Sequence, residues 1–112
     1  MKTENINLNK VEEMAEGDLE FQSELINAIY TSIQDFKNKY IEGLSSQNEL
    51  ILQQARHKIK PTLSLFELKK LKAVLQEGKD IVSSNGFSGL EKHQAQFEEA
   101  ADDLLKDLNK VM

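Results

Sequence analysis

The side chain best suited to carry out chemistry is the imidazole of His57. It lies in the stretch from Asn48 to Leu68, which has helical periodicity. On a helical wheel at about 100° per residue, the positions opposite His57 carry residues suited to a buried face. These are Leu52, Ala55, Ile59, Thr62, Leu63 and Phe66. The pattern predicts a helix that buries one side and exposes the imidazole of His57 on the other.

Polar side chains lie within one turn of His57. Gln53 and Gln54 precede it, and Lys60 follows it. Side chains three or four positions apart are neighbours on a helix, so Lys60 can meet negative charge at the imidazole with a charge-assisted hydrogen bond. The two amides can donate to the same charge. Because a neutral imidazole is a nucleophile, this spacing indicates a site that handles an anionic group.

Other chemistries lack the residues they need. The chain has no cysteine, so thiolate metal sites, cysteine nucleophiles and disulfides are excluded. No serine or carboxylate stands at catalytic spacing from His57, which leaves a free-standing enzyme using it as general base without a partner. Paired carboxylates beside His57 are also absent. We therefore predict no metal site and no cofactor.

His93 offers an internal comparison. On its own helical stretch it falls beside the apolar positions Leu90, Phe97, Ala101 and Leu104. We therefore interpret His93 as a structural residue of the core.

The periodic stretches predict an all-α protein, an antiparallel four-helix bundle with a short N-terminal helix, formed by residues 1–112 as a single domain. Asn7 is expected to cap a helix from Leu8 to about Glu16, and Asp18 a long second helix. The pattern breaks at 43–46, where Ser46 and Glu49 form a capping box for the helix that carries His57. Ser88 is the expected cap of the last helix, after a turn at 83–86. The apolar stripe of the second helix comprises Phe21, Leu25, Ala28, Ile29, Ile33, Phe36, Tyr40 and Leu44.

The composition of the chain limits the kinds of partner and the cellular location that we expect. The 112 residues carry a net charge of -5 and 39% hydrophobic residues, which suits one core and argues against nucleic-acid binding. The first ten residues do not resemble a signal peptide, and no run is long and apolar enough for a membrane span. We expect a cytoplasmic protein. Basic residues nonetheless cluster from Arg56 to Lys72, which suits an acidic partner or a phosphoryl group.

The pattern around His57 resembles the phosphoacceptor helix of histidine-containing phosphotransfer (HPt) domains. The matching residues are His57, Ile59, Lys60, Leu63 and Phe66, with further similarity at 17–21, at 24–26 and at Leu68, Leu71 and Leu75. The resemblance covers about residues 8 to 82. It implies that His57 carries a phosphoryl group between receiver-domain aspartates in a phosphorelay.

The resemblance also implies roles and partners. Lys60, Gln53 and Gln54 would stabilise the phosphoryl group. The partner would be a response-regulator receiver domain, which brings the aspartate and a magnesium ion, and the relay would include a hybrid or sensor histidine kinase. The protein would be a monomeric carrier and not itself an enzyme. The expected docking residues are Leu50, Arg56, Pro61 and Ser64, with Leu65 as a further apolar candidate.

Two positions depart from the family pattern. Pro61 and Glu67 stand where the family usually has glycine. Because of Glu67, the break after the His57 helix is expected to be displaced or reduced to a bend, and Pro61 is expected to bend the helix itself and to hinder the approach of a partner. They keep open a second hypothesis, an HPt-like bundle that binds proteins without being phosphorylated. The segment from His57 to Leu63 also resembles the histidine box of sensor kinases, but the chain has no glycine-rich segment or room for their ATP-binding domain.

Overall fold

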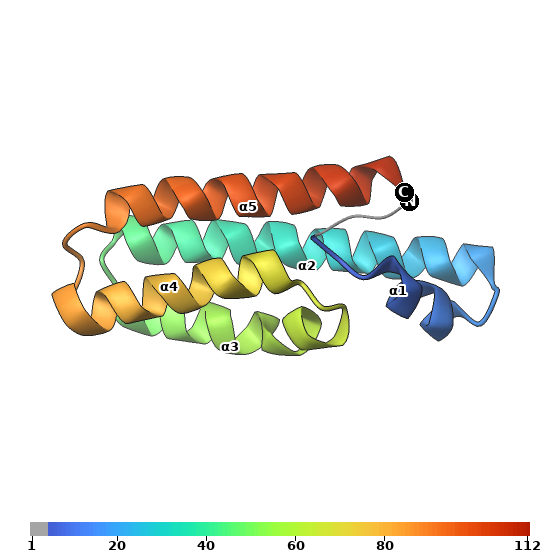
Figure 1. Cartoon of the computed structure of the whole chain (residues 1–112), viewed down its shortest axis with the longest axis horizontal. Helices are drawn as coiled ribbons and strands as arrows, with labels where there is room; N and C mark the ends of the chain where they lie inside the picture. Colours follow the sequence, from blue (N-terminus) through green and yellow to red (C-terminus); the bar gives the residue numbers. More distant parts are fainter. Residues whose placement is uncertain (1–4) are drawn as a thin grey trace.

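The computed structural model describes residues 5–112, which fold into five helices (Figure 1). They are α1 (Leu8–Ala15), α2 (Leu19–Ser45), α3 (Glu49–Leu65), α4 (Lys69–Asn85) and α5 (Leu90–Lys110). The described residues contain no strand. The all-α prediction is therefore confirmed. No helix within 5–112 is long and apolar enough to cross a membrane.

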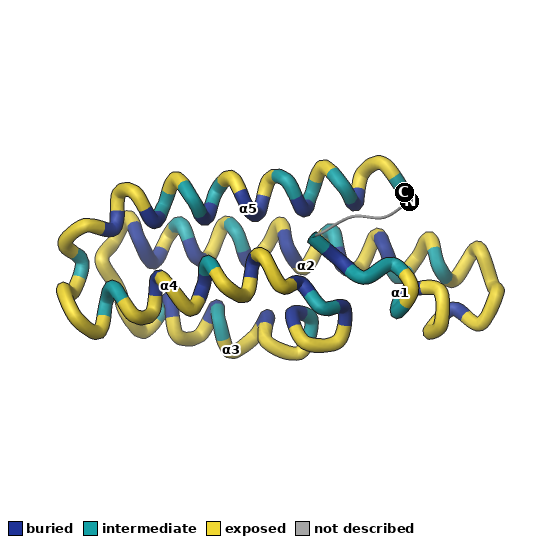
Figure 2. The backbone as a smooth tube through the Cα atoms, viewed as in Figure 1, coloured by how far each residue is buried: buried dark blue, intermediate teal, exposed yellow. Residues whose placement is uncertain are grey.

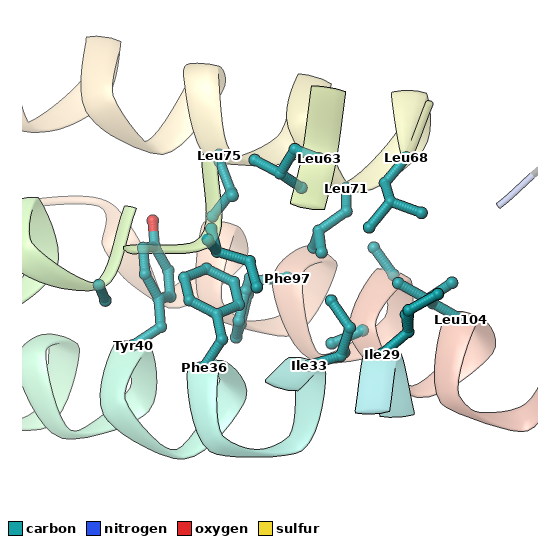
Figure 3. Packing of buried hydrophobic residues seen from close by; sticks show 14 of the residues in the cluster. Ile29, Ile33, Phe36, Tyr40, Leu63, Leu68, Leu71, Leu75, Phe97 and Leu104 are labelled. Atoms are coloured by element: carbon teal, nitrogen blue, oxygen red, sulfur yellow. The ribbon is translucent and has the colours of Figure 1, made fainter. Parts of the chain in front are cut away.

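The four long helices lie lengthwise beside one another in a molecule of 47 × 22 × 19 Å (Figure 1). Helix α2 packs against both α3 and α5, α4 packs against α5 and α3, and α1 packs on α2. Their buried faces form one apolar cluster, part of which is shown in Figure 3. Buried and exposed residues alternate along all four of these helices, as expected of helices that bury one face (Figure 2).

Two predicted helix starts are confirmed and two are wrong. The side chains of Asn7 and Asp18 accept hydrogen bonds from the backbone N–H groups of Asn9 and Phe21, as expected of N-caps. Helix α3, however, is capped by Asn48, which accepts from the N–H of Ile51 at 3.2 Å, and not by Ser46. Helix α5 begins after Gly89 without a side-chain cap, so Ser88 is not its cap either.

The prediction for Ser46 is wrong because helix α2 continues further than the polar residues at 43–46 suggest. The helix continues through the buried Gly43 to Ser45, and the hydroxyl of Ser46 donates to the carbonyl of Glu42 at 2.7 Å. The turn into α3 is then made by Gln47, whose φ is 54°. A serine bonded back to the preceding turn closes one helix and is not available to start the next.

The expected apolar stripe of α2 is wrong at two positions. Phe21 is 43% exposed and Ala28 is exposed, whereas Ile26, which the prediction omitted, is buried. The first turns of α2 extend beyond α3 and α4, and α1 covers only part of them (Figure 1). The buried series is therefore Ile26, Ile29, Ile33, Phe36, Tyr40 and Leu44.

The connection between α3 and α4 is a complete break, so the expectation of a displaced break or a bend is wrong. Glu67 adopts φ 53°, the left-handed conformation that glycine accepts most readily. The segment before α1 holds this turn in place: Asn7 donates from its backbone N–H to the Phe66 carbonyl at 2.9 Å and from Nδ2 to Glu67 Oε2 at 2.8 Å. These bonds compensate for a non-glycine residue at this position. Pro61, in contrast, lies within α3 without ending it.

Candidate functional site

His57 lies on the exposed side of α3, as predicted, at the edge of a groove of about 410 Å³ between α3 and α4. On the α3 side, the groove is bordered by residues that share one face of the helix with His57. On the α4 side, the contributing residues are spaced by three or four positions, which places them on one face as well. The lining residues are Glu49, Gln53, Arg56, His57, Lys60, Leu63, Lys72, Leu75, Gln76, Lys79, Val82 and Ser83.

The groove is strongly cationic. Arg56, Lys60, Lys72 and Lys79 line it, and Glu49 is the one carboxylate among the lining residues. Glu49 accepts a hydrogen bond from the Gln53 amide at 3.3 Å. None of the three lysines forms an ion pair with another residue in 5–112, whereas Lys37 and Lys39 on α2 do. The positive charge of the groove is therefore available to an anion from outside.

The structure brings together only part of the predicted site. Gln53, Arg56 and Lys60 line the groove with His57. The other predicted residues are exposed but do not line it: Gln54, Leu50, Pro61 and Ser64. Leu50 is 61% exposed and Leu65 is 50% exposed, so both offer apolar surface on α3 outside the groove.

Sequence reasoning missed the contribution of α4. Lys72, Gln76 and Lys79 line the groove from the α4 side, and none of them was among the predicted site residues, although Lys72 ends the predicted basic cluster. The signal was present in their spacing of four and three, which marks one face of a helix. Pairing that face with His57 required knowing that α4 packs beside α3.

A second groove, of about 200 Å³, runs along the opposite side of α3, between α3 and α2. Lys58 lines this groove together with Lys39 and Asp35. Lys58 is adjacent to His57 in sequence, yet it belongs to a different surface. The two sides of α3 therefore differ in their charge.

The second histidine is buried, as predicted. His93 is 1% exposed, and its Nε2 lies 2.7 Å from the hydroxyl of the buried Tyr40. Gly78 of α4 faces this pair so closely that a Cβ atom there would lie 2.6 Å from the Tyr40 hydroxyl and would overlap His93 Nε2. The Nδ1 atom of His93 has no hydrogen-bond partner among the described residues. The Tyr40–His93 pair therefore joins α2 to α5, and Gly78 of α4 packs against it.

Burial shifts the protonation of both rings. Loss of solvent raises the pKa of Tyr40 to about 12, although the nearby Arg56 guanidinium acts in the opposite direction. Loss of solvent lowers the pKa of His93, and the carboxylate of Glu77 partly opposes this effect. Arg56 also lowers the pKa of His93. Arg56 thus links the cationic groove to the buried pair.

The groove offers an exposed nucleophile next to unpaired cations. Within 5–112, no group of three or more His, Asp or Glu side chains is arranged to hold a metal ion. An imidazole flanked by lysines and amides is suited to accept an anionic group and to stabilise it afterwards. Comparison with protein-family models, with curated proteins and with solved structures finds no match.

Proposed function

We propose that this protein is a histidine phosphocarrier of the HPt type, in which His57 receives a phosphoryl group from the aspartate of one receiver domain and passes it to another. The observation that carries the proposal is the exposure of His57 in a groove lined by unpaired lysines. In this proposal, helices α2 to α5 form an antiparallel four-helix bundle, and α1 is the short N-terminal helix.

The chemical step is a phosphoryl transfer between an acyl phosphate and an imidazole. A nitrogen of neutral His57 attacks phosphorus, an N–P bond forms, and the P–O bond to the aspartyl carboxylate breaks with its electron pair staying on the carboxylate. The imidazole then releases its extra proton to solvent. The magnesium ion that polarises the phosphoryl group comes from the receiver domain, so the carrier is not itself the enzyme.

The groove residues stabilise the group once it is attached. Phosphorylation adds about 1.5 to 2 negative charges and three acceptor oxygens. Lys60 and Gln53 are within one helical turn of His57, and Lys72 and Gln76 approach from α4. Gln54 is exposed outside the groove and takes a smaller part.

The exposed residues on α3 around the groove form the docking surface for the receiver domain. Leu50, Pro61 and Ser64 supply its apolar and small side chains, and Arg56 supplies charge. The carrier acts as a cytoplasmic monomer, between a hybrid or sensor histidine kinase and a response regulator.

The test is transfer from phosphorylated receiver domains, or from a hybrid kinase, to the full chain. A label that is labile in acid, stable in base and located on His57 is the expected result. His57→Gln should abolish labelling while circular dichroism shows unchanged helicity. Lys58→Gln is the matched control, because Lys58 is the next residue but lies in the other groove, and it should keep the label. Labelling that survives in His57→Gln overturns the proposal.

One observation favours a second candidate. Pro61 is exposed one position after Lys60 and leaves the carbonyl of His57 without its usual helical donor. A bundle altered there is suited to bind receiver domains or other proteins without phosphorylation. In that case the parent takes up no label, and His57→Gln binds the partner as tightly as the parent does.

A further inference from the structure

The cationic groove extends well beyond His57. Lys72 and Lys79 are seven positions apart on α4, which is roughly 10 Å along the helix axis, with Gln76 between them. Arg56 and Lys60 line the α3 side. These cations come from two different helices over this length, so the groove can meet more than one anionic group at a time, and Lys79 takes no part in stabilising the phosphoryl group. The groove therefore carries more positive charge than the proposed chemistry uses.

The floor of the groove is apolar. Leu63 and Leu75 are buried at its base, and Val82 is half-buried near one end. Although these two leucines are already buried, more of the accessible surface of the groove is apolar than polar, so an occupant covers apolar surface and also meets the cations on both sides. A helix with one apolar stripe and carboxylates beside it has this chemistry, and helices commonly bind in grooves in this way.

The opposite side of α3 does not share these properties. The groove between α3 and α2 is about half the size, and its two lysines face Asp35 among the lining residues. Its Lys39 is also paired with Glu42 at 3.1 Å. In a chain of net charge -5, unpaired cations gather instead between α3 and α4.

We propose that the groove between α3 and α4 docks an acidic amphipathic helix of the partner protein, with Lys72 and Lys79 each engaging a carboxylate two helical turns apart. This inference rests on the proposed function, because it names the partner surface that lies over His57. It adds a contribution from α4 to the docking surface that α3 forms around His57. Association is then sensitive to ionic strength, as expected of exposed charge pairs.

The first experiment measures binding without phosphotransfer. The probe is a fluorescent helical peptide of about 20 residues with glutamates at positions i and i+7 beside a leucine stripe, titrated with the full chain. A peptide with glutamine at those two positions is the reference. We expect the acidic peptide to bind more tightly and to lose affinity as salt is raised.

The variants locate the contact. Lys72→Glu with Lys79→Glu should weaken binding about tenfold, which corresponds to about 1.4 kcal/mol. The matched control is Lys39→Glu with Lys58→Glu, which changes the net charge equally but alters the other groove, and it should bind within about twofold of the parent. Equal losses in both double variants, or equal binding of a flexible polyglutamate, would show general charge attraction and overturn the inference. Absence of peptide binding would overturn it as well.

Labelling of His57 separates this inference from the proposed function. Peptide binding that depends on Lys72 and Lys79, in a chain that no receiver labels, would leave the groove as a docking site and remove the phosphocarrier role. Labelling that proceeds at the parent rate in Lys79→Glu, which alters a groove lysine with no part in stabilising the phosphoryl group, would keep the carrier role and remove the docking role of α4.

Discussion

The two histidines of this chain occupy opposite environments. His57 is exposed on α3 beside unpaired lysines, whereas His93 is 1% exposed on α5 and bonded to Tyr40. The same side chain is therefore exposed to solvent in one place and serves as a polar contact within the core in the other. What differs is whether a neighbouring helix covers the ring. The environment, and not the residue type, separates the candidate chemical site from the structural one.

Among changes near the buried histidine, Gly78→Ala is expected to lower the stability of the protein most. The new Cβ would meet two rigid rings at once, the imidazole of His93 and the phenol of Tyr40. Overpacking and the disturbed hydrogen bond outweigh the better helix propensity of alanine, giving a net loss of about 2–4 kcal/mol in the free energy of unfolding. Urea unfolding followed by circular dichroism measures it.

A matched variant tests the cause. Adding Tyr40→Phe to Gly78→Ala removes the hydroxyl that the Cβ would meet, so the double variant should lose less stability than the two single losses combined. Strict additivity of the two changes would show that Gly78 is not packed against this pair as the structure has it.

A smaller effect is expected from Tyr40→Phe alone. The ring would keep its contacts with Phe36 and Phe97, whose centroids lie 5.6 and 4.3 Å away (Figure 3). The hydrogen bond to His93 Nε2 would be lost, and His93 would then have no partner for either nitrogen. A loss of about 1–2 kcal/mol in the free energy of unfolding follows. Tyr30→Phe is the control, because Tyr30 is only half-buried, and it should stay within about 0.5 kcal/mol of the parent. Equal losses in the two variants would contradict a special role for the buried pair.

Much of the fold could be predicted from sequence because each helix repeats apolar residues at steps of three and four. This periodicity predicted the exposure of His57 and the burial of His93 correctly. Helix ends were harder, since several nearby residues can satisfy the same capping rule: Asn48 and not Ser46 caps α3, and α5 begins after Gly89 with no side-chain cap. Phe21 was misjudged for a different reason: a residue counts as core only where another helix covers it.

The candidate site was predictable only on α3. Gln53 and Lys60 follow from their spacing to His57 within one helix. Lys72, Gln76 and Lys79 come from α4, and their proximity to His57 depends on how two helices pack, which no spacing within one helix reveals. The close contact of Gly78 with Tyr40 and His93 likewise joins three helices and leaves no local pattern.

The smallest effect concerns pH, and it follows from the lowered pKa of His93. Burial disfavours the charged ring in the folded state, while the unfolded chain titrates near the ordinary value of 6.5. The unfolded state thus binds more protons over this window, so the contribution of neutral His93 is complete above pH 6.5 and is lost as pH falls towards the lowered pKa. The effect is modest because one proton is involved and Glu77 partly offsets it. Unfolding free energies of the parent and of His93→Gln, measured between about pH 5 and 8, should diverge in slope below 6.5. If the parent and His93→Gln instead keep the same slope, burial of the His93 ring does not govern the pH response and the environment assigned to this residue is wrong.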